Sequence, residues 1–72
     1  MNLSETLLYG NKFLKINDIK TFSLDSELLL SKVLDIRREE LLINLHKRIE
    51  KKKFKKYKKL LKKRKNREPI AY

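Results

Sequence analysis

The sequence predicts an all-α fold, a small bundle of four helices, and two features support this class. The 72 residues include a single glycine, Gly10, and a single proline, Pro69, so the chain is poor in the turn residues that several strands would need. Apolar residues recur instead every three or four positions, the spacing of one helical face. A chain of this length forms one domain, and a fifth helical turn can follow Pro69.

The first helix is expected from Leu3 to Ile16, because its large aliphatic residues share one face. These residues are Leu3, Leu7 and Leu14. Gly10 falls on the same face, where the lack of a side chain allows another helix to approach closely. Asn2 or Ser4 can cap the start of the helix. Ile19 follows the helix and is expected in a loop tucked under the bundle.

The second helix is expected from Phe22 to Asp35. Residues 28–30 are all leucine and cover most of its circumference, so this helix should contact several neighbours and stand at the centre of the bundle. Asp25 and Glu27 lie in its first turns, where negative charge complements the positive end of the helix dipole. They are two residues apart and point to different sides, so they are not expected to act as an acid–base pair.

Two further helices are expected in the second half of the chain. A short one runs from Arg37 to Leu45, with His46 near its negative end. The last runs from Ile49 to Lys65 and carries a narrow apolar stripe beside a wide cationic face. The predicted core of the four helices consists of Leu3, Leu7, Leu14, Leu29, Leu30, Val33, Leu34, Leu41, Leu42, Leu45, Phe54, Tyr57 and Leu61.

Positive charge is concentrated in the last third of the chain. Residues 1–46 hold six Lys or Arg against seven Asp or Glu, whereas residues 47–72 hold fourteen against two. Such a helix can bind a polyanion or an acidic protein surface. A base composition that favours A-rich codons would also place lysine on a solvated face without any function, and this alternative stays open. The partner-binding face is represented by Lys55, Lys58, Lys59 and Lys62.

The composition excludes several kinds of chemistry. There is no cysteine and one histidine, His46, so a metal site built from several His and Cys ligands cannot form. The serines lie in no recognised nucleophile motif and there is no glycine-rich phosphate loop, so no catalytic, cofactor-binding or metal-binding residue is predicted. No apolar run approaches the ~20 residues of a membrane span. We expect a cytoplasmic monomer that does not bind membranes.

Three segments of the chain carry recognisable motifs. The most specific is Arg64–Tyr72, RKNREPIAY. It is similar to the R-x-x-G-E-P-[IL]-A-Y joint of the HemK/PrmC family, the glutamine methyltransferases that modify peptide chain release factors. Leu24–Leu30, LDSELLL, resembles the family's D-A-E-L-L-L helix. Arg37 followed by Leu41 resembles a third, shorter motif. The order and spacing of the three agree, and the resemblance covers about residues 3–72.

The resemblance implies that residues 1–66 form a substrate-recognition domain that helps to bind release factors. It implies that residues 67–72 begin a linker to a methyltransferase domain, which would bind S-adenosylmethionine and hold the substrate glutamine. This segment would then bind no cofactor and catalyse no reaction, whereas its parent would be an enzyme. Ser26 stands where the family usually has alanine. Arg67 replaces the usual glycine, so Asn66 becomes the candidate for a left-handed turn there.

Three functions therefore remain open at this point. The first is the recognition domain of a release-factor methyltransferase, inactive by itself. The second is a small basic module that binds RNA or the ribosome, which the charge of residues 47–72 favours. The third is a folding unit whose charge only keeps it soluble.

Overall fold

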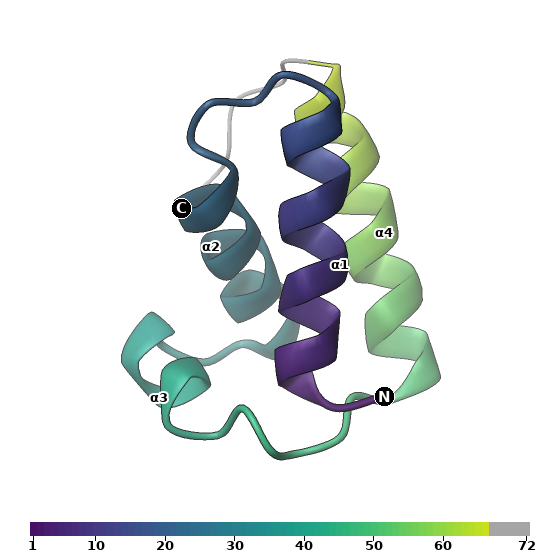
Figure 1. The fold of residues 1–72 in the computed structure, drawn as a ribbon. Helices are drawn as coiled ribbons and strands as arrows, with labels where there is room; N and C mark the ends of the chain where they lie inside the picture. Colours follow the sequence, from purple (N-terminus) through teal and green to yellow (C-terminus); the bar gives the residue numbers. More distant parts are fainter. Residues whose placement is uncertain (67–72) are drawn as a thin grey trace.

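A computed structural model of the chain describes residues 1–66 as four α-helices. Helices α1, α2 and α4 each pack against the other two, and α3 packs against α2 at one end of the bundle (Figure 1). The all-α prediction and the central place of α2 are thus confirmed. The expected linker over 67–72 and the turn after Pro69 lie outside the described residues. The bounds are α1 Leu3–Ile16, α2 Phe22–Leu34, α3 Arg38–Leu42 and α4 Lys51–Lys65.

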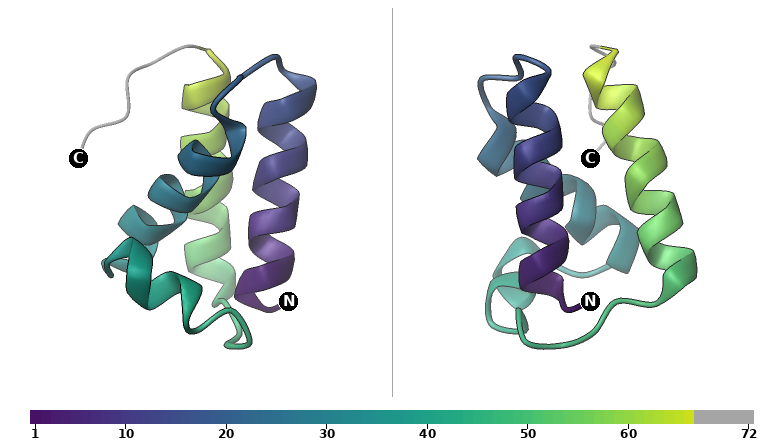
Figure 2. Two further views of the ribbon diagram at one scale, coloured as in Figure 1. Left: turned by 60° about the vertical axis from the view of Figure 1, so that its left-hand side comes forward. Right: turned by 45° about the vertical axis from the view of Figure 1, so that its right-hand side comes forward.

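Helix α1 has the predicted bounds, and Asn2 caps it. The backbone N–H of Glu5 donates to Asn2 Oδ1 at 2.8 Å, and the N–H of Asn2 donates to Glu5 Oε1 at 2.9 Å. This reciprocal pair satisfies two amides at the start of the helix. The N–H of Leu3 donates to the carbonyl of Lys47 at 2.8 Å. The loop between α3 and α4 is therefore fixed to the start of α1, as the two views of Figure 2 show.

Aspartates in the left-handed region follow α1 and α2. Asp18 has φ 62° and Asp35 has φ 55°, a conformation that aspartate tolerates better than most residues. Asp35 therefore caps α2 instead of belonging to it. After Asp18 the chain turns back, the N–H of Ile19 donates to the carbonyl of Leu14 at 3.0 Å, and Ile19 is buried as predicted. Asn66 has φ −80°, so the left-handed turn expected there is wrong.

Helices α3 and α4 are shorter than predicted. Helix α3 ends at Leu42 instead of Leu45, and His46 lies exposed in the loop that follows. Leu41 is fully buried, whereas Leu42 is 41% exposed, so its assignment to the core is wrong. Successive residues of a helix differ by about 100° in direction, and a helix of little more than one turn offers α2 only one such position.

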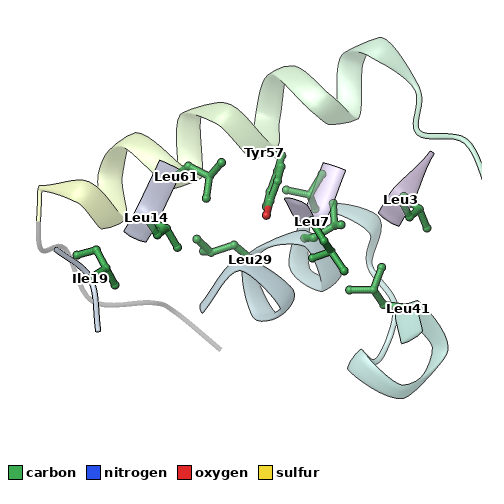
Figure 3. Packing of buried hydrophobic residues seen from close by; sticks show 10 residues of the cluster. Leu3, Leu7, Leu14, Ile19, Leu29, Leu41, Tyr57 and Leu61 are labelled. Atoms are coloured by element: carbon green, nitrogen blue, oxygen red, sulfur yellow. The ribbon is translucent and has the colours of Figure 1, made fainter. Parts of the chain in front are cut away.

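The core forms one cluster that runs the length of the bundle, from Ile19 at one end to Leu41 at the other (Figure 3). Burial of each large aliphatic side chain contributes about 1.5–3 kcal/mol. Leu34, Leu45 and Phe54 were predicted to be core residues and pack half-buried against its edge. The buried hydrophobic residues are Leu3, Leu7, Leu14, Ile19, Leu29, Leu30, Val33, Leu41, Tyr57 and Leu61.

Gly10 lies where α1, α2 and α4 meet. A Cβ atom at this position would lie 2.0 Å from Tyr57 Oη and 3.1 Å from Ser26 Cβ, so the close approach predicted for Gly10 is confirmed. The Tyr57 hydroxyl points into the bundle (Figure 3) and donates to the carbonyl of Ser26 at 3.1 Å. Burial raises the pKa of Tyr57 well above its usual range, so the phenol keeps its proton at pH values at which an exposed tyrosine loses it.

Candidate functional site

The lysine-rich helix α4 is held in one rotation by contacts with α2. Tyr57 and Leu61 are fully buried and direct one face of α4 inward. The side chain of Arg64 lies on the same stripe, and its Nε donates to Asp25 Oδ2 at 2.8 Å. Lys53 Nζ donates to the carbonyl of Val33 at 3.4 Å. These contacts determine which of the remaining lysines face solvent and which border α2.

The pair between Asp25 and Arg64 is a feature that the sequence interpretation missed. Asp25 lies in the first turn of α2, where it was expected to complement the helix dipole, and it is also only 5% exposed. Its Oδ2 accepts from both Arg64 and the Thr21 hydroxyl, each at 2.8 Å. A buried carboxylate needs such partners because losing water is costly. The signal was present in α4, because Arg64 follows Leu61 by three residues and therefore falls on the apolar face.

The other early carboxylate of α2, Glu27, is also engaged. Arg38 Nε donates to Glu27 Oε1 at 2.6 Å, and the Arg38 side chain is 46% exposed. An exposed pair of this kind stabilises the fold by about 0–1 kcal/mol. Its relevance here is electrostatic, because both acidic residues in the first turns of α2 pair with arginines. Neither is therefore paired with a lysine of α4.

The four lysines predicted to contact a partner lie on the outer side of α4. Lys55, Lys59 and Lys62 are exposed. Lys58 is half-buried, and its Nζ lies 5.1 Å from the centre of the Phe54 ring, a cation–π arrangement. Helical spacing places Lys55, Lys59 and Lys62 on the side of α4 opposite Tyr57, with Lys58 at its edge. Their contact with a partner stays a prediction.

A groove of about 330 Å³ lies between α2 and α4, and we call it the α2–α4 groove. Only Lys59 belongs to both the predicted face and this groove. On the α4 side of the groove, Lys59 shares one helical stripe with Lys56, Leu60 and Lys63. The membership of these three residues in the groove wall could have been predicted from their spacing alone. Lys32 could not, because its place depends on how α2 packs. No acidic residue of the described chain lines the groove, which is bordered by Lys32, Val33, Lys56, Lys59, Leu60 and Lys63.

The described residues lack the features that several other kinds of site require. Within residues 1–66, no three His, Cys, Asp or Glu side chains gather as a metal ion would require. No helix in the same range is both long and apolar enough to cross a bilayer. The single glycine, Gly10, lies inside α1 against Tyr57 and forms no phosphate-binding loop. The lysine surfaces of α4 are thus the main candidate site.

The four-helix arrangement, with a cationic outer face and a lysine-lined groove, defines a small, basic, all-α domain. The chain belongs to the PrmC N-terminal domain family, whose model matches residues 5–72. This match confirms the resemblance to the HemK/PrmC proteins that the sequence motifs indicated. Comparison with curated proteins and with solved structures gave no match.

Proposed function

We propose that the chain is the substrate-recognition domain of a protein-glutamine methyltransferase and helps to bind a peptide chain release factor in the cytoplasm. The observation that carries the proposal is membership of the PrmC N-terminal domain family. The HemK/PrmC enzymes, which the sequence resembles, methylate release factors. The role of this bundle would be to hold the protein substrate, while methyl transfer would take place in a separate domain.

Residues 1–66, which the structure describes, offer no glycine-rich turn for the cofactor of that reaction. S-adenosylmethionine would need a pocket built by a glycine-rich turn, as nucleotide-type cofactors commonly do. The one glycine of the chain is in the middle of α1, and its surroundings are filled by Tyr57 and Ser26. We therefore assign cofactor binding to the methyltransferase domain that the family resemblance implies.

The electrostatics of α4 support a role in binding. Residues 47–66 lie mostly on α4 and the loop before it, and their lysines outnumber the acidic residues nearby. A charged surface of this kind speeds the approach of a partner of opposite charge and selects against partners of like charge. The rigid contacts of Tyr57 and Arg64 with α2 present that surface in a fixed orientation, which lowers the entropy lost on binding.

Binding of RNA is the second candidate function, and the same lysines favour it. Electrostatic binding of single-stranded RNA weakens steeply as salt rises, with a slope set by the number of neutralised phosphates. Sequence-tolerant RNA binding also uses aromatic or arginine side chains on which bases stack. The exposed part of α4 presents lysines, and its aromatic residues Phe54 and Tyr57 are half-buried and buried, which makes this candidate the weaker one.

The two functions are distinguished by titrating the 72-residue chain with a release factor and with an unstructured RNA. Each titration is made at about 50 mM and about 200 mM salt, a range over which phosphate-dominated binding falls by orders of magnitude. An acidic protein of unrelated fold serves as the control for charge alone. We expect saturable binding of the release factor that persists at the higher salt. Equal loss of all three interactions would refute the proposal, and absence of binding would indicate a bare folding unit.

A further inference from the structure

We propose that the α2–α4 groove binds an acidic protein segment that inserts one apolar side chain between Val33 and Leu60. Carboxylates of the segment would pair with the lysines at the rim of the groove. The identity of the protein that carries the segment rests on the proposed function, whereas the chemistry of the groove does not. The site therefore differs from the outer face that the sequence predicted, with which it shares only Lys59.

The charge of the groove determines the sign of its occupant. Four ammonium groups border it, and no carboxylate of the described chain does so. The two acidic residues within α2 are engaged in ion pairs, Asp25 with Arg64 and Glu27 with Arg38. An anionic segment would relieve the mutual repulsion of the lysines, so the electrostatic contribution to binding is favourable.

The floor of the groove favours a peptide over RNA. Val33 is 8% exposed and belongs to the core, and Leu60 is half-buried beside it. An aliphatic side chain on this floor would be removed from water, which contributes roughly 25 cal/mol per Å² of apolar surface. A phosphate backbone gains nothing from such a floor, and RNA bases need aromatic or arginine side chains on which to stack. The six lining residues include neither.

The size and rigidity of the groove suit a short segment. Its volume of about 330 Å³ lies at the lower end of the range of protein pockets that bind small groups. The stripe from Lys56 to Lys63 spans about 10 Å of helix, a length that an extended chain covers in about three residues. Helix α4 is fixed to α2 through Tyr57 and Lys53, so the groove is formed before binding.

The test uses a fluorescein-labelled peptide of aspartate and glutamate with two central leucines, and anisotropy is measured with the 72-residue chain. A second peptide replaces both leucines with serine at equal charge, and an RNA oligonucleotide of similar charge is the third probe. The groove variant is K56Q/K63Q. Its control is K51Q/K65Q, which makes the same charge change at exposed positions of the same helix that lie about 140° and 160° around the helix axis from Lys56 and Lys63, respectively. Circular dichroism confirms that both variants fold.

We expect K56Q/K63Q to weaken binding of the leucine peptide about fivefold, as for the loss of two exposed charge pairs. K51Q/K65Q should change it less than about twofold, and the serine peptide should bind the unmodified chain more weakly than the leucine peptide. Equal losses in the two variants, equal binding of the two peptides, or a preference for RNA would each overturn the inference. If the release factor binds the unmodified chain but both variants lose equal affinity for the leucine peptide, the groove inference fails and the proposed function stands. Selective peptide binding without release-factor binding would overturn the proposed function alone.

Discussion

Replacing Gly10 with alanine tests the packing that positions α4. On an exposed helix this substitution stabilises a protein by about 1 kcal/mol, because alanine is the better helix former. At Gly10 the added Cβ would lie 2.0 Å from Tyr57 Oη and 2.9 Å from Tyr57 Cζ. The tyrosine must therefore move, and its hydrogen bond to the carbonyl of Ser26 is lost. We predict that Gly10→Ala destabilises the fold.

The magnitude follows from three contributions. Overpacking in a tight core costs about 1–3 kcal/mol. A buried hydroxyl left without its acceptor costs about 1–3 kcal/mol more, and the buried Tyr57 hydroxyl donates to the carbonyl of Ser26. After subtracting the gain of about 1 kcal/mol in helix propensity, the net loss of stability is about 1–5 kcal/mol. A domain of this size has only a few kcal/mol to lose.

The assay is urea unfolding followed by circular dichroism, with Tyr57→Phe to complete a double-mutant cycle. Tyr57→Phe alone should cost about 1 kcal/mol, the usual value of one hydrogen bond. It also removes the hydroxyl that clashes, so Gly10→Ala should cost about 1 kcal/mol or less in this background, a coupling of about 2 kcal/mol. A stabilising effect of Gly10→Ala in the unmodified chain, or a coupling near zero, would refute the reasoning.

The remaining predictions use the same unfolding assay. Because burial raises the pKa of Tyr57 in the folded state, only the unfolded state releases the tyrosine proton near pH 10. The stability of the fold should therefore fall as pH rises above that value. The fall should be less steep in Tyr57→Phe, which has no proton to release at this position. Asp25→Ala should lower the free energy of unfolding by about 1–3 kcal/mol, because Asp25 pairs at a buried position. Glu27→Ala breaks an exposed pair and should lower it by less than about 1 kcal/mol. Equal losses in the two variants would contradict the burial argument. Leu30→Ala should lower the free energy of unfolding by about 2–5 kcal/mol. Leu42→Ala, at an exposed position, should change it by less than about 0.5 kcal/mol. A large effect at Leu42 would show that this residue belongs to the core.

Much of the fold could be predicted because local signals and tertiary packing agree. The bounds of α1 follow from its leucine spacing and the Asn2 cap, and both were predictable. Helix α3 shows where local reasoning ends. Its leucines suggested a longer helix, but the chain after Leu42 leaves the helix and meets the start of α1, where Lys47 accepts a hydrogen bond from Leu3. Only the packed structure contains that contact.

The candidate site was predictable in kind but not in position. Lysine density identified α4 as a cationic helix, and the apolar stripe identified its inward face. The groove additionally needs Lys32 from α2, which lies 24 positions before Lys56 in the sequence. The burial of Asp25 with Arg64 is likewise a product of how the two helices pack. Pairs of this kind depend on tertiary arrangement, to which helical periodicity is blind.

The central claim is that the chain binds a release factor through the lysine surfaces of α4. The most direct measurement is the mapping of amide chemical shifts of the 72-residue chain during titration with a release factor. The account predicts saturable changes at α4 and at Lys32, with little change at Leu8, which is exposed on α1. Absence of saturable changes, or changes confined to α1 and α3, would contradict it.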